Sequence, residues 1–295
     1  MQEKTESAFW LAVLQSATLG VSEKKQFLQG WCLEDGRPLS ELFKTSTASL
    51  MKLLGTSQKK VEALRAAGSK AASIQARLEE LANDGIRFLH RNSPAYPDSL
   101  AQRLDLAWQP FFFFYAGNLA LLTQPCLALT GSESPTPEVG RTLDTVIGGI
   151  VGAELNVVNG YRRGLERDAV DQAVETGASA VAVLPMGLQQ AGSILDRGRP
   201  GIEQGNLLLL SPYLPQQAYS ERLARARRGL VLAMSELLLL VAPDAEPASW
   251  PLLAQFCARG GRLLSWGRSQ ALPSDWGQKD VQTIETMDEL ATHLT

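Results

Sequence analysis

The sequence predicts an α/β protein in which a small all-helical domain precedes a doubly wound domain, whose mostly parallel sheet carries helices on both faces. Two observations carry this prediction. From residue 79 onward, short runs of Val, Leu and Phe alternate with stretches of helical length. These runs are apolar throughout rather than at every second position, which is typical of strands buried on both faces. We therefore expect two domains, residues 1–78 and 79–295, with a boundary between 78 and 85.

The N-terminal part contains short amphipathic helices. Its apolar residues recur at helical spacing over residues 9–17. A helix that ends at Leu54, a turn at Gly55 and a second helix directly afterwards predict a helical hairpin. The second helix is expected to start at Gln58, so Lys59 and Lys60 lie in its first turn, where backbone amides and lysines can contact DNA phosphates. Solvated lysines on a purely structural bundle are the alternative.

The rest of the chain predicts alternating strands and helices. The strands are expected at residues 86–90, 111–117, 126–132, 155–160, 180–185, 207–212, 237–243 and 262–266, with helices near 137–153, 164–176, 218–235 and 248–259. The second of these strands begins with four phenylalanines, Phe111 to Phe114. We expect them to be buried, because four consecutive aromatic rings cannot all be solvated. The alternative is an exposed platform on which bases stack.

The composition of the chain excludes a disordered, collagen-like or coiled-coil protein. The chain has 295 residues, of which 45% are hydrophobic, and a formal net charge of -3. This composition suits a packed core and gives no global basic signature for nucleic acid. Residues 1–78 nevertheless hold 11 Lys and Arg against 7 Asp and Glu. The remainder is acidic.

The cysteines and histidines argue against disulfides and metals. Cys32, Cys126 and Cys257 are scattered and odd in number, which indicates a reducing compartment. With only His90 and His293, a histidine-rich metal site is not expected. The N-terminus lacks the apolar core of a signal peptide, and no apolar run approaches 18 residues. We expect a cytoplasmic protein that needs no cofactor and does not associate with a membrane.

Two loops that follow predicted strands are candidates for phosphate binding. In a doubly wound sheet, ligands bind at the carboxyl ends of the strands, beside helix N-termini. The loop after residue 130 and the loop over 159–164 supply glycines, hydroxyls and two arginines. The candidates are Gly131, Ser132, Asn159, Gly160, Arg162, Arg163 and Gly164. Plain turns and a solvated helix start are the alternatives. No G-x-G-x-x-G follows a strand and no P-loop motif is present, which excludes those nucleotide-binding classes.

A second basic cluster lies on the helix predicted over 218–235. Arg222, Arg225 and Arg228 step by three and so share one broad face, with Arg227 beside them. A basic stripe on an otherwise acidic domain is typical of phosphate binding. We include these four arginines in the candidate DNA-binding or phosphate-binding set. A solvated helix face is the alternative.

The order and spacing of several segments resemble those of the DNA-processing protein A (DprA/Smf) family. The segments are LEELANDGIRFLHRNSPAYPDSL, QPFFFFYAGNLALL, CLALTGSESPTPEVG, LNVVNGYRRGLERDAV, AVAVLPMGL and LLLLSPYLP. The resemblance implies a sterile-alpha-motif or helix-hairpin-helix-like domain before an extended Rossmann-like domain. It also implies a non-enzymatic protein that binds single-stranded DNA, protects incoming DNA and loads a RecA-type recombinase in natural transformation. Such proteins are commonly homodimers.

The match departs from the family pattern at several positions. The family's Gly-Ser-Arg ends here in Glu133, and a carboxylate repels a phosphate. Its Ser-Gly-x-x-Arg-Gly-x-Asp motif keeps Gly160, Arg163 and Gly164. Two further family motifs carry Pro212 and Trp250 here, and we expect no winged-helix segment after the α/β domain. The sequence is therefore identified as a divergent member of the family.

Two other functions remain open from the sequence. One is a sensor of the related SLOG type, which would bind a nucleotide derivative at the strand-end glycines. The other is a hydrolase that resembles the cytokinin-activating LOG enzymes. Those enzymes need a Gly-Gly-x-Gly-Thr string with a glutamate, and this sequence lacks that string.

The two parts of the chain are expected to be separable, because the change of pattern at 78–85 leaves each part its own core. A fragment of residues 79–295 is expected to fold and stay soluble. Circular dichroism and a thermal melt of the fragment beside the full chain measure this. An insoluble or non-cooperative fragment from a chain that is itself well folded would contradict the two-domain prediction.

Overall fold

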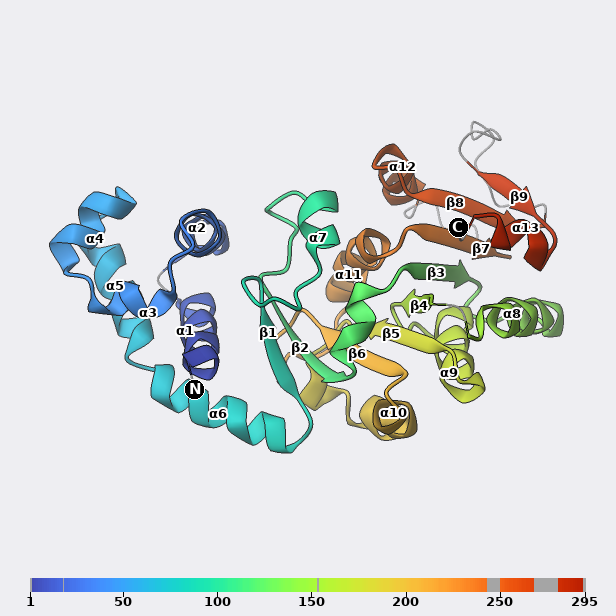
Figure 1. Cartoon of the computed structure of the whole chain (residues 1–295), viewed down its shortest axis with the longest axis horizontal. Helices are drawn as coiled ribbons and strands as arrows, with labels where there is room; N and C mark the ends of the chain where they lie inside the picture. The colour runs from blue at the N-terminus through green and yellow to red at the C-terminus, as the bar shows by residue number, and fades with distance from the viewer. Residues whose placement is uncertain (1, 18, 153, 243–249, 268–280, 294–295) are drawn as a thin grey trace. The chain divides into compact units, whose positions relative to one another are not determined.

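The computed structural model describes residues 2–17, 19–152, 154–242, 250–267 and 281–293 (Figure 1). The chain forms two compact units. One consists of Met1–Tyr96 with Leu104–Phe113, and the other of Pro97–Arg103 with Phe114–Thr295. The domain boundary at 78–85 stays a prediction, since these units show which residues are in contact and not which segment folds alone.

The first unit is built mainly from helices. They are α1 (Gln2–Gln15), α2 (Val21–Leu28), the π-helix η1 (Gln29–Glu34), α3 (Leu39–Lys44), α4 (Thr47–Leu54), α5 (Gln58–Gly68) and α6 (Ala71–Asn83), followed by strand β1 (Arg87–His90). Gly55 caps α4 in the left-handed conformation, with φ 55°, and α5 follows at once. The predicted helical hairpin is therefore confirmed.

The core of this unit is aromatic and aliphatic. Apolar side chains from all these α-helices except α6 meet in it, because they recur at the spacing of one helix face. Its members include Trp10, Val13, Leu28, Trp31, Leu39, Leu42, Leu50, Val61, Leu64 and Phe111. Burial of each large apolar side chain contributes roughly 1.5–3 kcal/mol to folding.

The second unit contains most of a largely parallel sheet. The strand order is β1-β2-β6-β5-β4-β3-β7-β8-β9. The strands are β2 (Phe112–Gly117), β3 (Cys126–Gly131), β4 (Asn156–Asn159), β5 (Ser179–Val183), β6 (Leu207–Ser211), β7 (Leu237–Val241), β8 (Arg262–Trp266) and β9 (Gln282–Ile284). β2 pairs antiparallel with β6, and the pairs from β6 to β9 are parallel. The predicted fold class is confirmed.

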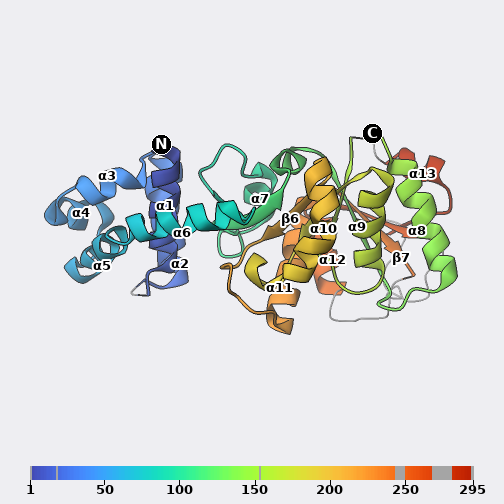
Figure 2. The ribbon, with the colours of Figure 1, turned by 90° about the horizontal axis from the view of Figure 1, so that it is seen from below.

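Helices cover both faces of this sheet. They are α7 (Asp98–Arg103), α8 (Pro137–Ile150), α9 (Leu165–Thr176), α10 (Gly192–Gln204), α11 (Glu221–Met234), α12 (Trp250–Ala258) and α13 (Met287–Ala291), with 3₁₀ turns at Leu119–Thr123 and Leu188–Gln190. α9 and α11 both pack on β3, β4 and β5, and they do so from opposite faces (Figure 1). α8, α9 and α10 lie side by side in Figure 2. The sequence did not predict α7, α10, β9 and α13.

The predicted burial of the phenylalanine run is confirmed for most of its rings. Phe111, Phe113 and Phe114 are at most 2% exposed. Phe112 is half-buried and stacks on Phe88, with the ring centroids 5.9 Å apart. A platform for base stacking needs exposed ring faces, so these residues act in packing.

His90 is buried in the core of the helical unit without a hydrogen bond from its ring. Its side chain is 4% exposed and stacks on Trp10, with ring centroids 4.8 Å apart. Neither ring nitrogen has a hydrogen-bond partner among the described residues. Burial therefore disfavours the charged ring and lowers the pKa of His90 from 6.5 to about 4.

The depressed pKa of His90 predicts a loss of stability in weak acid. Between pH 6.5 and 4 the unfolded chain binds a proton at this ring that the folded chain does not, so stability falls as the pH is lowered through this window. At 1.36 kcal/mol for each pKa unit, the free energy of unfolding is lower by about 3 kcal/mol when the pH has fallen to 4. Denaturant melts of wild type and His90→Phe from pH 4 to 7.5 measure the difference.

We expect the stability of His90→Phe to depend less steeply on pH than that of wild type. His293→Gln removes the only other histidine of the chain and serves as the matched control. Parallel curves for wild type and His90→Phe would contradict the role given to burial.

Candidate functional site

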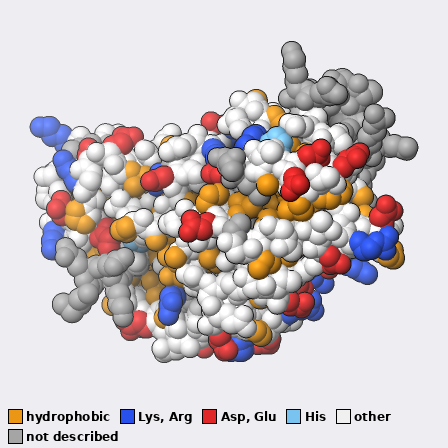
Figure 3. Space-filling view, turned by 45° about the vertical axis from the view of Figure 1, so that its right-hand side comes forward, with side chains coloured by type: hydrophobic (Ala, Val, Ile, Leu, Met, Phe, Trp, Pro, Cys, Tyr) orange, Lys and Arg blue, Asp and Glu red, His pale blue; other side chains and the backbone are white. Residues whose placement is uncertain are grey.

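A pocket of about 510 Å³ in the α/β unit is rich in basic side chains. Seven arginines and two glutamates take part in its wall, although the whole chain carries a net charge of -3. They are Arg162, Arg163, Arg167, Arg197, Arg225, Arg227, Arg228, Glu133 and Glu221. On the face drawn in Figure 3 acidic and basic side chains are interspersed. We call this pocket the arginine pocket.

The topology of the sheet explains why these residues meet. Glu133 follows β3, Arg162 follows β4, and Leu184 to Met186 follow β5. Parallel strands end at the same edge of a sheet, so the three loops lie beside one another. α11 packs on the opposite face from α9 and adds Arg225, Arg227 and Arg228 to the same edge.

Arg227 forms the buried part of the arginine pocket. It is 5% exposed, and its guanidinium occupies the space above Gly160, where an added Cβ would lie 0.9 Å from Nη1. The carboxylate of Glu166 lies 3.9 Å from the same Nη1. Burial lowers the pKa of Arg227 and Glu166 opposes this shift. The guanidinium stays charged, because arginine does not lose its proton in proteins. Its buried Nε has no hydrogen-bond partner among the described residues.

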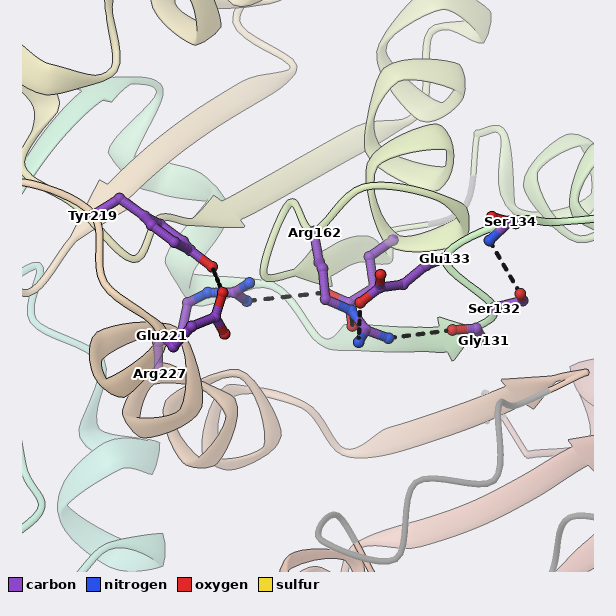
Figure 4. Close-up of polar contacts among 9 residues, drawn as sticks. Gly131, Ser132, Glu133, Ser134, Arg162, Tyr219, Glu221 and Arg227 are labelled. Carbon is purple, nitrogen blue, oxygen red and sulfur yellow. Dashed lines mark hydrogen bonds and ion pairs between the residues drawn. The ribbon is translucent and has the colours of Figure 1, made fainter.

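Arg162 is held by two carboxylates. Its Nη1 lies 2.7 Å from Oε1 of Glu133, and its Nε lies 3.7 Å from Oε1 of Glu166 (Figure 4). A second nitrogen, Nη2, donates to the carbonyl of Gly131 at 3.4 Å. Glu133, which was expected to repel a phosphate, therefore engages a neighbouring arginine. The Glu133 side chain is 55% exposed, so this ion pair contributes at most about 1 kcal/mol.

The strand-end loops are packed closely on one another. Gly164 has φ +86°, and an added Cβ would lie 2.5 Å from the carbonyl oxygen of Ser132. That oxygen also accepts a hydrogen bond from the amide of Leu165, and Ser132 Oγ accepts one from Ser134 (Figure 4). An added Cβ at Gly131 would lie 2.2 Å from the carbonyl oxygen of Val241. The two glycines thus allow the loops to approach, and they bring Glu133 to Arg162.

Asn159 has a structural position rather than a place in the pocket wall. It is 1% exposed. Its Oδ1 accepts from the amide of Leu129 at 3.1 Å, and its Nδ2 donates to the carbonyl of Glu166 at 3.2 Å. The side chain therefore ties β3 to the start of α9.

Tyr161 and its neighbours form one side of the pocket. Tyr161 has φ +56°, a left-handed conformation that is uncommon outside glycine and occurs at functional sites. Its hydroxyl donates to Asp171 at 2.6 Å, and Asp171 also lies 3.3 Å from Arg197. Burial and the hydrogen bond to Asp171 raise the pKa of the Tyr161 hydroxyl. The guanidinium of Arg167 lies 5.7 Å from the ring centroid, within cation–π range.

The structure brings most of the predicted arginines together. Arg162, Arg163, Arg225, Arg227 and Arg228 line the arginine pocket. The predicted residues at the strand ends support the loops of the pocket without lining it: Gly131, Ser132, Asn159, Gly160 and Gly164. Arg222 is exposed on α11 and lies outside the pocket. Arg163 and Arg225 are exposed and have no ion-pair partner among the described residues.

The lining residues that were not in the predicted set include Tyr161, Arg167, Arg197 and Tyr219. Arg167 lies four residues after Arg163, so helical spacing could have identified it. Arg197 could not be found in this way, because it lies on the unpredicted helix α10.

The part of the chain that the structure describes offers neither a metal site nor a membrane span. No three His, Cys, Asp or Glu side chains gather there as metal ligands. Among the described helices, none has the length and apolar character needed to cross a bilayer.

Comparisons with known proteins place the chain in a family. Residues 87–255, more than half of the chain, match the model of DNA recombination-mediator protein A. The chain belongs to this family. Its curated relative DNA processing protein DprA of Streptococcus pneumoniae is 27% identical over 150 residues, which are 48% of this chain and 52% of that protein. The chain thus spans about half the length of that DprA.

Solved structures of DprA proteins share the fold. The crystal structure of DprA from Streptococcus pneumoniae matches with a TM-score of 0.59 and 19% identity, over 76% of this chain and 81% of that one. DNA processing protein A from Helicobacter pylori, described for its unique single-stranded DNA binding mode, matches with a TM-score of 0.59 and 18% identity, over 71% and 95%. The family resemblance of the sequence is thereby confirmed.

The contact between Gly160 and Arg227 predicts how an alanine at position 160 acts. Gly160→Ala would place a methyl group inside the Arg227 guanidinium, and this buried side chain would have to move. We expect the substitution to lower stability by about 1–3 kcal/mol, as overpacking does. Thermal or denaturant melts measure this.

Gly148→Ala is the matched control, because an added Cβ at this helical glycine meets nothing within 4 Å. We expect it to leave stability unchanged or raise it by up to about 1 kcal/mol, since alanine favours helix. Equal effects of the two substitutions would contradict the packing of Arg227 on Gly160.

Proposed function

We propose that this protein is a recombination mediator that binds single-stranded DNA through the arginine pocket. The observation that carries the proposal is the gathering of seven arginines at the carboxyl edge of the sheet, in a member of the DNA recombination-mediator family. The Helicobacter pylori relative, which is described as binding single-stranded DNA, supports the choice of ligand.

The charges of the pocket suit phosphodiesters. Arg163 and Arg225 are exposed and unpaired among the described residues, so their guanidinium groups are free to fork onto phosphate oxygens. Arg227 and Arg162 are held by Glu166 and add positive potential from below. These arginines form the proposed DNA-binding site, and Arg222 and Arg228 extend it along α11. The loops that carry the site are supported by the residues at the strand ends: Gly131, Ser132, Asn159, Gly160 and Gly164.

A single strand fits the pocket better than a duplex. A flexible backbone can follow a concave wall and bring successive phosphates to arginines from three elements, whereas duplex DNA is stiff. The ring of Tyr219 is 51% exposed at the rim and is available for stacking against an unpaired base.

The finer parts of the function belong to the same proposal. They are the protection of incoming DNA, the loading of a RecA-type recombinase in natural transformation, and action as a cytoplasmic homodimer without catalysis. The family to which the chain belongs supports the role in recombination. A helical domain 1–78 and a DNA-binding domain 79–295 are proposed as the functional parts.

A nucleotide sensor is the second candidate. The volume of about 510 Å³ lies in the range of small-molecule sites, and basic side chains suit a nucleotide phosphate. The length of the ligand separates the two functions. A DNA-binding pocket gains affinity with each added nucleotide until the site is full, and a sensor is saturated by a mononucleotide.

Arg163→Glu tests the proposed function. We expect it to weaken binding to a long labelled oligo(dT) at least about tenfold at low salt and to reduce the salt slope by about 1, because a phosphate contact is lost. Fluorescence anisotropy at several salt concentrations measures both. Arg199→Glu is the matched control, since Arg199 is exposed on α10 and lies outside the pocket.

Glu133→Arg tests the same pocket in the opposite direction. We expect tighter binding, because an acid is removed from the pocket wall and a cation is added. Glu175→Arg makes the same change of charge at an exposed position outside the pocket. The proposal fails if wild type binds no single-stranded DNA at low salt, or if Arg163→Glu binds as Arg199→Glu does. Saturation by a mononucleotide with equal affinity would favour the sensor.

A further inference from the structure

Three buried nitrogens at the arginine pocket have no hydrogen-bond partner among the described residues. They are the Nε atoms of Arg162, Arg167 and Arg227, and all three side chains line the pocket. Buried donors are nearly always paired in folded proteins, so each unpaired one calls for an explanation. Three such donors, all on cations, in the wall of one pocket indicate a site whose acceptors come from an anionic ligand.

Arg227 is the most deeply buried of the three. Its side chain is only 4% exposed, and the carboxylate of Glu166 lies 3.9 Å from its Nη1, which is too long for a hydrogen bond. A buried charge without close acceptors is unfavourable, because burial removes the water that would solvate it. An anion that reaches Arg227 would offset this cost.

Arg162 and Arg227 are placed to share one anion. They come from different elements, the loop after β4 and α11, and Figure 4 shows the Arg227 side chain reaching toward Arg162. The carboxylate of Glu166 lies 3.7 Å from Nε of Arg162 and 3.9 Å from Nη1 of Arg227, so both guanidinium groups lie near one point. Two arginines in this arrangement suit a single phosphate, because each can donate to a different oxygen.

The charge of the pocket favours a phosphate at the end of a strand over one in its interior. A terminal phosphate is a monoester with a charge of about −1.5 to −2 near pH 7 and three free oxygens. A phosphate inside the strand is a diester, which carries a single charge. The seven arginines of the wall outnumber its two glutamates, so the more highly charged group gains more.

The burial of Arg227 favours the strand end for a steric reason as well. A phosphate inside the strand lies between two sugars, and both would have to enter the pocket before the phosphate could contact a buried guanidinium. A terminal phosphate is attached to one sugar and can enter first. The volume of about 510 Å³ lies in the range of sites that enclose a small molecule, which suits a single nucleotide.

The rest of the wall suits the sugar and the base. Most of the arginines come from α11 and from the start of α9 with the loop before it, whereas the loop after β5 and α10 add apolar side chains, among them Pro185, Met186 and Ile194. The ring of Tyr219 is 51% exposed at the rim. A nucleotide has the same division into a charged phosphate and a base with apolar faces. The pocket therefore offers a surface to each part.

We propose that the arginine pocket binds the terminal nucleotide of a single strand, with its phosphomonoester between Arg162 and Arg227. The inference rests on the proposed function and makes its ligand more specific, a strand end rather than any stretch of single strand. The exposed Arg163, Arg225 and Arg222 then contact the phosphates that follow along the strand. The terminal phosphate is at the 5′ or the 3′ end, and the experiment separates the two.

Competition binding to the full chain tests this inference. The probe is an oligo(dT) with two hydroxyl ends and an internal fluorescent label, and anisotropy reports its displacement. The competitors are oligo(dT) strands of equal length with a 5′-phosphate, a 3′-phosphate, two hydroxyl ends, or no ends because they are circular. We expect one of the phosphorylated strands to bind at least about tenfold more tightly than the hydroxyl strand, and the circle to bind no more tightly than the hydroxyl strand.

A hydroxyl strand that is one nucleotide longer is the control for charge. It adds a negative charge as a diester, so a general attraction to anions would raise its affinity as a terminal phosphate does. We expect its gain in affinity to be much smaller than that of the phosphorylated strand.

Arg227→Lys locates the terminal phosphate, because lysine keeps the charge and loses the planar fork. We expect the ratio of the affinities for the phosphorylated and the hydroxyl strand to fall to about one. Arg222→Lys is the matched control, the same substitution at an exposed position of α11 outside the pocket, and is expected to keep the wild-type ratio. Gly160→Ala, which displaces the Arg227 guanidinium, is expected to lower the ratio as well. Thermal melts show whether each variant is folded.

The outcomes separate this inference from the proposed function. Equal affinities of the phosphorylated strand and the hydroxyl strand, or of the phosphorylated strand and the circle, overturn the inference and leave DNA binding intact. Equal gains from the terminal phosphate and the added nucleotide do the same, as do equal ratios in Arg227→Lys and Arg222→Lys. If wild type binds none of the strands at low salt, the proposed function fails, and the inference fails with it.

Discussion

Glu166 is the counter-charge on which the arginine pocket depends. Seven guanidinium groups in one wall repel each other, and two of them come from segments more than sixty residues apart. The carboxylate of Glu166 is 14% exposed and lies 3.7 Å from Arg162 and 3.9 Å from Arg227. A partly buried carboxylate between two cations holds them in fixed positions. The exposed arginines can then stay unpaired without the pocket expanding.

The position of Glu166 is itself a result of the fold. Gly164 lets the loop after β4 pass close to Ser132, and Asn159 anchors the backbone carbonyl of Glu166 to the end of β4. α9 therefore begins at a fixed distance from the loop after β3. The packing of strands, loops and helices thus determines where the charges stand, and the charges in turn determine which ligands the edge of the sheet attracts.

Strands β1 to β8 were predictable because burial leaves short apolar runs between turn residues, whereas β9, with two of its three residues exposed, leaves no such run. α10 was not predictable, because Gly192, Gly198, Gly201 and Pro200 read as a loop. Tertiary packing explains the helix. An added Cβ at Gly198 would lie 2.7 Å from Leu207, and one at Gly201 would lie 2.5 Å from Val174. These glycines let α10 lie close to β6 and α9, and such a gain is invisible to local propensity.

The sequence predicted which arginines form the site but not which acid each of them pairs with. The sequence located Arg162, Arg163 and the arginines of α11, because strand ends and helix periodicity can be read locally. It indicated that Glu133 would oppose anions, while the structure pairs Glu133 with Arg162 across 29 residues of sequence. Which arginine an acid pairs with depends on how closely two loops pack, and a single sequence does not record the distance between them.

The close fit of Gly160 beneath Arg227 has a consequence for how this family can vary. Gly160 has no positive φ, so its φ does not require a glycine, and the guanidinium above it does. The restriction on one position is thus conditional on the other. Members of the family that lack the buried arginine are free to carry a side chain at the glycine position, and the two sites are expected to change together during evolution.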